Sequence, residues 1–303
     1  MSVPQLNAPQ REAIHYLDGP CLVLAGAGSG KTRVITQKIA YLVGECGFNP
    51  HNIAAITFTN KAAKEMLERI SKLMGGRVAK GLTVCTFHAM GVRIVRQEAK
   101  YLGLKPQFSI LDSTDTTQII AEMTGNTDKN RAKALQWQIS SWKNALIEPD
   151  EAAQLASDEI SSSAALLYRD YDKTLRAYQG VDFDDLIRLP VKLFDEHPEV
   201  RERWQNKLRY LLVDEYQDTN RAQYRLLKLL TGVRGAFTAV GDDDQAIYAW
   251  RGADVENLRQ LPVDFPSLRV IKLEQNYRST TRILNAANTV IANNEKLFEK
   301  KLW

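Results

Sequence analysis

Short, largely apolar runs alternate with longer amphipathic stretches through the first 110 residues. Residues 22–25, 53–57 and 82–86 are such runs, each of a length that suits a strand buried on both faces of a sheet. After each run, apolar side chains recur at helical spacing, as in the helix predicted over 88–101. The alternation predicts an α/β fold with a doubly wound parallel sheet flanked by helices.

Capping residues indicate where several of these helices begin and end. A helical pattern over 11–17 follows Asn7, and Asn60 is predicted as the N-cap of the helix after the second strand. The helix after the first strand is expected to end at Gly44 and Gly47, because glycine accepts the left-handed conformation common at helix ends.

The strand pattern is absent between about residues 113 and 197. Helical runs take its place, separated by clusters of Gly, Pro, Ser and Asp, at 116–124, 131–142 and 164–178. Apolar strand patterns then return at 209–213, 236–240 and 269–273, and a helix is predicted to start at Thr219 or Asn220. We interpret the middle segment as an all-helical subdomain inserted into the sheet domain.

Composition is that of an ordinary soluble globular protein of about two domains. Of the 303 residues, 44% are hydrophobic and 25% charged, and the sequence contains no apolar run of the length needed to span a membrane and no signal-peptide pattern. We therefore expect a cytoplasmic protein without membrane partners. Cys21, Cys46 and Cys85 are odd in number and widely spaced, which favours reduced core thiols over disulfides or a zinc site.

Charge is unevenly distributed although the net charge is only +4. Residues 61–105 contain ten Lys or Arg against three Glu, whereas residues 148–159 contain five carboxylates and no basic side chain. A basic stripe of this density is typical of contact with a phosphate backbone. A solvated helix face explains the charge alone equally well.

A glycine-rich loop joins the first predicted strand to the helix that follows it. Glycines let backbone N–H groups turn toward one anion, and the helix N-terminus adds its dipole. Lys31 is expected to reach the β- and γ-phosphates and Thr32 to place its hydroxyl on Mg²⁺, so the expected ligand is a nucleoside triphosphate. Alanine stands at the first glycine position, and a chance glycine turn is the alternative. The loop is Ala25, Gly26, Ala27, Gly28, Ser29, Gly30, Lys31 and Thr32.

Two acidic residues end the strand predicted at 209–213. In a phosphate-loop enzyme, Asp214 would hold Mg²⁺ through water and Glu215 would polarise the attacking water. An acidic surface loop is the alternative, but the pair occurs in the same chain as a phosphate loop. The combination favours the catalytic interpretation.

The strand predicted at 236–240 is also followed by polar and aromatic side chains. Gln245 is placed to sense the γ-phosphate or its water, as glutamines do in other NTPases. Tyr248, Trp250 and Arg251 combine aromatic faces with a cation, which suits stacking on single-stranded bases. The aromatic residues are equally typical of a protein core.

Together these motifs resemble superfamily 1 DNA helicases of the UvrD, PcrA and Rep group, and most of all its Rep branch. Eight ordered motifs extend over almost the whole chain, which makes chance resemblance negligible. They lie at residues 6–10, 25–32, 57–63, 86–88, 182–186, 213–218, 241–252 and 275–279.

The resemblance implies roles around the nucleotide. Gln10 matches the residue that reads the adenine edge, and Tyr277 matches the ring stacked on the adenine. Arg33 and Arg69 match arginines near the nucleotide, and Arg278 matches an arginine finger on the γ-phosphate. On this resemblance the catalytic group comprises Lys31, Asp214, Glu215, Gln245 and Arg278.

The resemblance also implies a single-strand track and a motif without a catalytic role. The predicted DNA-binding residues are Phe58, Asn60, Thr86, His88, Tyr248, Trp250 and Arg251. Asp182, Asp184 and Asp185 match a family motif to which we assign no catalytic part.

Such helicases have two RecA-like motor domains, and only 25 residues follow Arg278. The resemblance therefore implies the N-terminal part of a longer protein, with a RecA-like P-loop NTPase domain at residues 1–110 and 201–278. The helical insertion is expected at 111–200 and the start of a second motor domain at 279–303. The whole protein is expected to translocate 3′ to 5′ on single-stranded DNA and to separate tailed or forked duplexes in replication restart or repair, with ATP and Mg²⁺ as cofactors.

Two other interpretations remain open at the sequence level. A P-loop phosphotransferase acting on a small molecule would need an acceptor pocket and a lid, and it leaves residues 245–251 unexplained. Alternatively, the chain binds ATP and DNA without turnover. We expect this 303-residue chain alone to be monomeric, with little or no unwinding activity, and replication or repair proteins are its expected partners.

Overall fold

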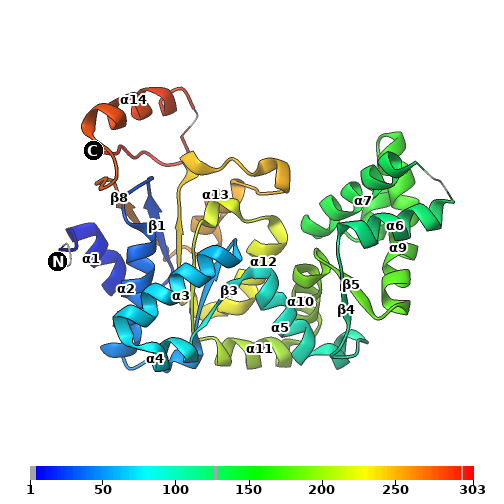
Figure 1. Cartoon of the computed structure of the whole chain (residues 1–303), viewed down its shortest axis with the longest axis horizontal. Helices are drawn as coiled ribbons and strands as arrows, with labels where there is room; N and C mark the ends of the chain where they lie inside the picture. Colours follow the sequence, from blue (N-terminus) through cyan, green and yellow to red (C-terminus); the bar gives the residue numbers. More distant parts are fainter. Residues whose placement is uncertain (1–4, 126–127, 295) are drawn as a thin grey trace. The chain divides into compact units, whose positions relative to one another are not determined.

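The computed structural model describes residues 5–125, 128–294 and 296–303. The chain divides into two compact units, and Figure 1 labels many of their elements. Unit 1 comprises Met1–Thr86, Glu202–Thr219 and Leu230–Trp303, and unit 2 comprises Phe87–Arg201 and Asn220–Leu229. The helical insertion predicted at 111–200 lies inside unit 2.

A parallel β-sheet forms the centre of unit 1. Among the described residues it has six strands in the order β3-β2-β6-β7-β1-β8, and each neighbouring pair runs parallel. The strands are β1 (Cys21–Ala25), β2 (Ile53–Thr57), β3 (Thr83–Thr86), β6 (Tyr210–Val213), β7 (Phe237–Gly241) and β8 (Arg269–Leu273). The α/β fold class with a parallel sheet is confirmed, and the strands lie where the apolar runs predicted them.

The central strands β1, β2, β6 and β7 are buried along their whole length, as expected where helices cover both faces of a parallel sheet. Every residue of β1 is buried, and Val23 pairs in register with Val240 on one side and Ile271 on the other. Since all strands are parallel, their carboxyl ends share one edge of the sheet. The loops that follow β1, β2, β6 and β7 therefore start from the same edge.

Helices of unit 1 begin at side-chain caps. Asn7 caps α1 by accepting from the Gln10 backbone N–H at 2.9 Å. The predicted cap of α3 is wrong by one residue: Thr59 is the N-cap and accepts from the Ala62 N–H at 3.1 Å, because its backbone is extended whereas Asn60 is already helical. The helices of this unit are α1 (Ala8–His15), α2 (Lys31–Gly44), α3 (Asn60–Met74), α4 (Gly76–Gly81), α13 (Glu256–Asp264) and α14 (Thr281–Ile291).

Unit 2 is built mainly from helices. Two of them, α5 and α10, approach closely: a Cβ on Gly91 would lie 1.8 Å from the Leu186 carbonyl oxygen, so only glycine fits there. The helices are α5 (Phe87–Gln97), α6 (Ser113–Thr124), α7 (Lys129–Asn144), α8 (Pro149–Leu155), α9 (Glu159–Ala177) and α10 (Asp185–Glu196). Helices α11 (Pro198–Lys207) and α12 (Arg221–Thr231) each include residues of both units.

One expectation for the insertion needs correction, because it is not all-helical. Strand β5 (Gly180–Asp182) pairs in parallel with β4 (Ser109–Leu111), and Val181 at the centre of β5 is fully buried. Three residues are too few to display the alternation by which a strand is recognised in a sequence. The helical pattern of α9 ends directly before the strand.

A buried ion cluster holds α7, α9, β5 and α10 together. The Lys143 ammonium has no exposed surface and lies 3.0 Å from Asp172, 2.7 Å from Asp182 and 3.1 Å from Asp185. The Tyr171 hydroxyl donates to Asp182 at 2.9 Å. Burial lowers the pKa of Lys143, but the three carboxylates outweigh burial and raise it, so the lysine stays charged. The motif around Asp182 thus has a structural role inside unit 2.

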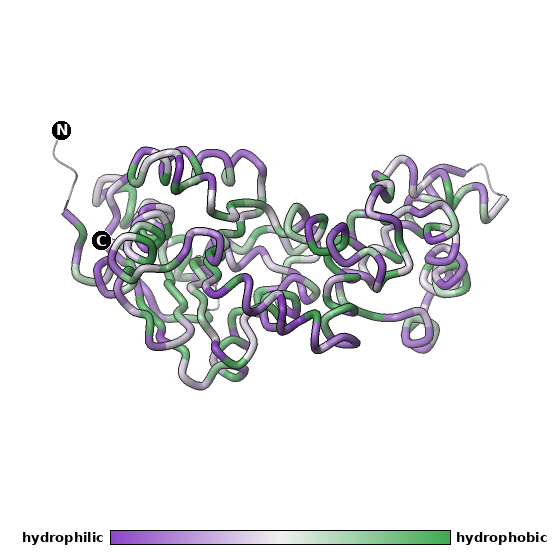
Figure 2. The backbone as a smooth tube through the Cα atoms, turned by 90° about the horizontal axis from the view of Figure 1, so that it is seen from below, coloured by the Kyte–Doolittle hydropathy of each residue, from purple (hydrophilic) through white to green (hydrophobic). Residues whose placement is uncertain are grey.

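Polar and apolar stretches alternate along the helices of both units (Figure 2), as expected for helices with one buried face. Among the described residues, no helix combines the length and the apolar character needed to cross a bilayer. Cys21 and Cys85 are buried, as predicted for core thiols, whereas Cys46 is only half-buried.

Candidate nucleotide and DNA site

The glycine-rich loop connects β1 to α2, as predicted. Gly28 and Gly30 have φ angles of 74° and 96°, which favour glycine, and Gly30 is the N-cap of α2. The Ser29 hydroxyl donates to the Gly26 carbonyl at 2.7 Å and fixes the turn. The N-terminal turn of α2 therefore begins directly after the loop, the geometry that binds phosphate in other proteins.

Gln10 packs against this loop from α1. Its side-chain amide donates to the Ser29 carbonyl at 3.0 Å, and a Cβ on Gly30 would come within 2.9 Å of that amide nitrogen. Gln10 is fully buried, so its polar side chain has a defined position rather than a solvated one. The structure thus brings Gln10 to the phosphate loop.

The segment after β8 also contacts the loop. The Tyr277 N–H donates to the Gly28 carbonyl at 2.9 Å, and the Tyr277 hydroxyl accepts from Asn7 at 2.9 Å. A Cβ on Gly28 would lie 2.6 Å from the Arg278 Cβ. Tyr277 is half-exposed, with 51% of its surface accessible. Tyr277 and Arg278, predicted from sequence to act on the nucleotide, therefore meet the loop directly.

The predicted acids lie at the end of β6. Glu215 accepts from the Lys31 ammonium at 2.9 Å, which joins the end of β6 to the start of α2. Glu215 has a φ of 48°, an uncommon conformation for a residue with a side chain, and such strain is frequent at functional sites. Burial, reinforced by the charge of Glu215, raises the pKa of Asp214 to about 6.

The donor set beside the loop suits Mg²⁺. Thr32 is the neighbour of Lys31 in the chain, and Asp214 is the neighbour of Glu215. The contact between Lys31 and Glu215 therefore brings the Thr32 hydroxyl and the buried Asp214 carboxylate to the same region. Hydroxyl and carboxylate oxygens are ligands that Mg²⁺ prefers. Arg33 lies in the first turn of α2. Arg69 on α3 is exposed, and its positive charge offsets a part of the rise in the pKa of Asp214.

Gln217 lies within the acidic motif at residues 213–218, but the sequence predicts no role for it. Its amide nitrogen donates to Glu215 at 3.0 Å and its amide oxygen accepts from the Asp242 N–H at 3.0 Å. The side chain therefore connects the ends of β6 and β7. Its position two residues after Glu215 is the one signal in the sequence that points to it.

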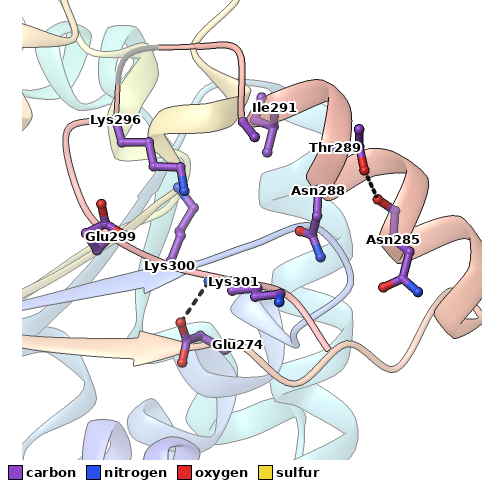
Figure 3. Close-up of a pocket in the computed structure, with 10 residues that line it drawn as sticks. Glu274, Asn285, Asn288, Thr289, Ile291, Lys296, Glu299, Lys300 and Lys301 are labelled. Carbon is purple, nitrogen blue, oxygen red and sulfur yellow. Dashed lines mark hydrogen bonds between the residues drawn. The ribbon is translucent and has the colours of Figure 1, made fainter.

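Gln245 lies in a short 3₁₀ turn after β7, where its side chain donates to Asp242. The Lys300 ammonium pairs with Asp242 at 2.7 Å and with Asp244 at 3.0 Å, and it also pairs with Asp243. Sequence reasoning missed Lys300, because no local pattern links it to β7. A cavity of about 660 Å³ lies beside Lys300 and α14, and Figure 3 shows Lys296, Lys300 and Lys301 lining it. None of the predicted nucleotide residues lines this cavity.

Tyr248, Trp250 and Arg251 form one exposed group after this turn. The two ring centroids are 6.5 Å apart, and the Arg251 guanidinium lies 5.4 Å from the Tyr248 centroid and 4.6 Å from that of Trp250. Trp250 is 67% exposed, so it is not a core residue. An exposed pair of rings beside a cation suits stacking on bases.

The other predicted DNA-binding residues are distributed over the two units. In unit 1, half-buried Phe58 and exposed Asn60 follow β2, and buried Thr86 ends the neighbouring strand β3. In unit 2, the His88 ring lies 5.7 Å from the Phe183 ring, and burial lowers the pKa of His88. The basic residues at 61–105 lie on both units: those of α3 and α4 in unit 1 and those from Arg93 onward in unit 2.

A parallel sheet with a phosphate loop after one strand and acids after another is the arrangement of a P-loop nucleotide-binding domain. The family model of the UvrD/REP helicase N-terminal domain matches residues 6–266. The chain belongs to this family, which confirms the resemblance seen in its motifs.

Curated relatives agree with this membership. The chain is 54% identical over 302 residues to the ATP-dependent DNA helicase Rep of Escherichia coli, covering 99% of this chain and 45% of that protein. It is 46% identical to Rep of Buchnera aphidicola subsp. Baizongia pistaciae, covering 98% of this chain and 44% of that protein. It is 47% identical to the ATP-dependent DNA helicase PcrA of Staphylococcus aureus, covering 98% and 41%. The chain therefore spans less than half the length of these relatives.

Proposed function

We propose that the chain is a motor domain of an ATP-dependent DNA helicase and that it binds and hydrolyses ATP. The observation that carries the proposal is the 2.9 Å contact between Lys31 of the phosphate loop and Glu215 at the end of β6. A lysine for the phosphates and a carboxylate for the attacking water are the two charged groups that a P-loop ATPase needs together. The helicase names of the relatives support the same function.

In this proposal the loop amides and Lys31 hold the phosphates of ATP. Lys31 is then released from Glu215, because its charge pairs with the β- and γ-phosphates instead. Glu215 orients and polarises a water that attacks the γ-phosphorus while the bond to the bridging oxygen breaks, giving ADP and phosphate. Thr32 and Asp214 would hold Mg²⁺, which supplies positive charge for the phosphate oxygens when bound.

Groups outside the loop complete the nucleotide site in this proposal. Gln10 reads the adenine edge and Tyr277 stacks on the adenine, both from positions next to the loop. Arg278 neutralises charge that develops on the γ-phosphate, with Gln245 orienting the water. Arg33 and Arg69 add positive potential around the nucleotide.

Single-stranded DNA is the proposed partner of the exposed aromatic group. Tyr248 and Trp250 would stack on bases while Arg251 contacts the backbone or a ring face. Phe58, Asn60, Thr86 and His88 extend the proposed track. We further propose 3′ to 5′ translocation, action on tailed or forked duplexes, a role in replication restart or repair, and a cytoplasmic location.

Phosphate release measured with and without single-stranded DNA tests this function. A motor is stimulated by DNA because DNA binding and hydrolysis are coupled, whereas a small-molecule phosphotransferase is indifferent to it. Trp250→Ala serves as the matched variant, since it removes the most exposed ring and leaves the phosphate loop intact. Hydrolysis that DNA does not alter, in either protein, would contradict the proposal.

A further inference from the structure

Gln217 uses both ends of its side-chain amide at the candidate catalytic site. Its nitrogen donates to Glu215 Oε2 at 3.0 Å, and its oxygen accepts from the Asp242 backbone N–H at 3.0 Å. Only 2% of Gln217 is exposed, so the amide has little access to water as an alternative partner. A buried amide with both ends satisfied has one preferred orientation.

The surrounding backbone is shaped to admit this side chain. A Cβ on Gly241 would lie 2.9 Å from the Gln217 amide oxygen and 3.3 Å from its backbone nitrogen. Any other residue at position 241 would push the amide away from the end of β7. Asp242 itself is 2% exposed, and its N–H would be left buried without a partner if the amide moved.

Glu215 depends on side-chain contacts for its position, because it is only partly buried. It has a left-handed φ of 48°, and 39% of its side chain is exposed. The same carboxylate oxygen, Oε2, accepts from Lys31 at 2.9 Å and from Gln217 at 3.0 Å. When ATP draws Lys31 to the phosphates, the hydrogen bond from Gln217 remains.

We infer that Gln217 is a positioning residue for Glu215, holding the carboxylate by one end of its amide and fastening it to the end of β7 by the other. This inference rests on the proposed ATPase function. Gln217 contacts neither nucleotide nor water in this role. It acts by keeping the carboxylate where a water on the γ-phosphate can meet it.

Two substitutions separate positioning from folding. Gln217→Leu keeps the apolar bulk and removes both hydrogen bonds. Gln217→Glu keeps the shape and the acceptor for the Asp242 N–H but replaces the donor to Glu215 with a second carboxylate. Gln223→Leu is the control, because Gln223 is also a buried glutamine and its amide oxygen accepts from the backbone of Asn220, outside the site.

Single-turnover hydrolysis of MgATP by excess protein, with nucleotide affinity measured in parallel, tests the inference. Both Gln217 variants should lose about 10- to 100-fold in the hydrolysis rate, the usual range for a lost supporting hydrogen bond, while ATP affinity changes less than about twofold. The control should match the unsubstituted chain. Equal rates in Gln217→Glu and the unsubstituted chain would overturn the inference.

Crystal structures give a second readout that does not need turnover. In the Lys31→Ala background, which removes the other contact to Glu215 Oε2, Gln217→Leu should move the Glu215 carboxylate from the place that it has in Lys31→Ala alone. An unmoved carboxylate would overturn the inference. If the unsubstituted chain shows no hydrolysis at all, the proposed function fails, and the crystal comparison still decides whether Gln217 positions Glu215.

Discussion

Lys31 and Glu215 are separated by 184 residues in the sequence, yet their charged groups are 2.9 Å apart. Parallel strand topology causes this proximity, since β1 and β6 end at the same edge of the sheet with only β7 between them. The Lys31 side chain is 11% exposed and the Glu215 side chain 39%, so solvent reaches the carboxylate more readily than the ammonium. In the proposed mechanism this pair separates when a phosphate of ATP competes for the lysine.

Lys31→Ala should abolish productive ATP binding and leave the fold intact. The lysine is proposed to act as a point charge on the phosphates, and its ammonium pairs with Glu215 rather than with the apolar core, so its loss should remove binding energy and leave the core intact. Calorimetric titration of ATP with Mg²⁺ checks the affinity, and thermal unfolding checks the fold. Lys192→Ala, a half-exposed lysine of unit 2, is the control. Unchanged ATP affinity in Lys31→Ala would rule out the loop as the phosphate site.

Lys143→Met should destabilise unit 2 strongly. The substitution leaves buried Asp182 without its cation, whereas Asp172 and Asp185 keep their contacts with Arg188. Removing one partner of a buried ion pair costs about 3–5 kcal/mol. Tyr171→Phe, which removes one hydrogen bond to the same cluster, should cost only about 1–2 kcal/mol. Urea unfolding measures both. Equal losses in the two variants would show that the charge of Lys143 is not what the cluster needs.

Lys38 should make stability rise with pH above about 8. Burial lowers the pKa of Lys38 from 10.5 to about 8, and its ammonium donates to the carbonyls of Ala13 and Tyr16. A folded pKa below the unfolded one means that the folded state binds fewer protons between pH 8 and 10.5, so the free energy of unfolding rises over that range by up to about 3 kcal/mol. Below pH 8 both states are protonated and this contribution is constant.

Lys38→Met removes the titrating group and provides the comparison. The difference in unfolding free energy between the unsubstituted chain and Lys38→Met should grow from pH 8 to 10, whereas the same difference for exposed Lys192→Met should not. Urea unfolding at a series of pH values measures it. Parallel pH profiles for the chain and Lys38→Met would mean that Lys38 keeps its ordinary pKa.

The sheet and its loops could be predicted from the sequence because the signals are local. The run from Leu22 to Ala25 and the glycines after it contain the whole pattern of strand, loop and helix start. Errors arose where two neighbouring residues compete for one role or where an element is very short. Thr59 rather than Asn60 caps α3, and β5 has only three residues.

Some contacts between distant segments could not be predicted from local patterns. Lys300 pairs with Asp242, and Gln217 bridges to the backbone of that same aspartate. Each contact depends on which strands are neighbours, and the strand order is a property of the folded chain. Lys143 appears in the sequence as an ordinary helical lysine, and only the packing of four elements shows that it is buried among three carboxylates.

Trp250→Ala should weaken binding to single-stranded DNA and leave ATP affinity unchanged. Stacking of a base on an aromatic side chain contributes about 1–3 kcal/mol, so the loss should be about 5- to 150-fold in Kd. Binding should also weaken steeply with salt, because phosphate contacts release counterions. Fluorescence anisotropy of a labelled oligonucleotide measures both. If Trp250→Ala binds single-stranded DNA as tightly as the unsubstituted chain, the Trp250 ring is not part of the proposed DNA track.

The chain spans 45% of the length of the Escherichia coli relative, so we expect its own activity to be limited. A second motor domain that supplies an arginine typically contributes about 10³ to 10⁵ in rate. The 303-residue chain should therefore bind ATP and single-stranded DNA weakly and hydrolyse ATP slowly. It should not unwind a 3′-tailed duplex in a fluorescence assay. Processive ATP-dependent unwinding by this chain would contradict the proposal that a second motor domain is needed.

Asp214 and Glu215 should have separable roles, although they are adjacent. Asp214→Asn should weaken the dependence of nucleotide binding on Mg²⁺, because it removes the buried carboxylate proposed to hold the ion. Glu215→Gln should leave nucleotide and Mg²⁺ binding intact, since the amide keeps the shape of the side chain and loses only its charge. Titration of each variant with Mg²⁺ at fixed ATP distinguishes them. An equal loss of binding in both variants would contradict this division.

The most direct test of the proposed ATPase site is single-turnover hydrolysis of MgATP by the unsubstituted chain and by Glu215→Gln. The carboxylate is proposed to polarise the attacking water, a contribution of about 10²- to 10⁴-fold. We predict that the unsubstituted chain releases phosphate and that Glu215→Gln binds ATP equally well but releases phosphate at least about 100-fold more slowly. Phosphate release by Glu215→Gln at the rate of the unsubstituted chain would contradict the account.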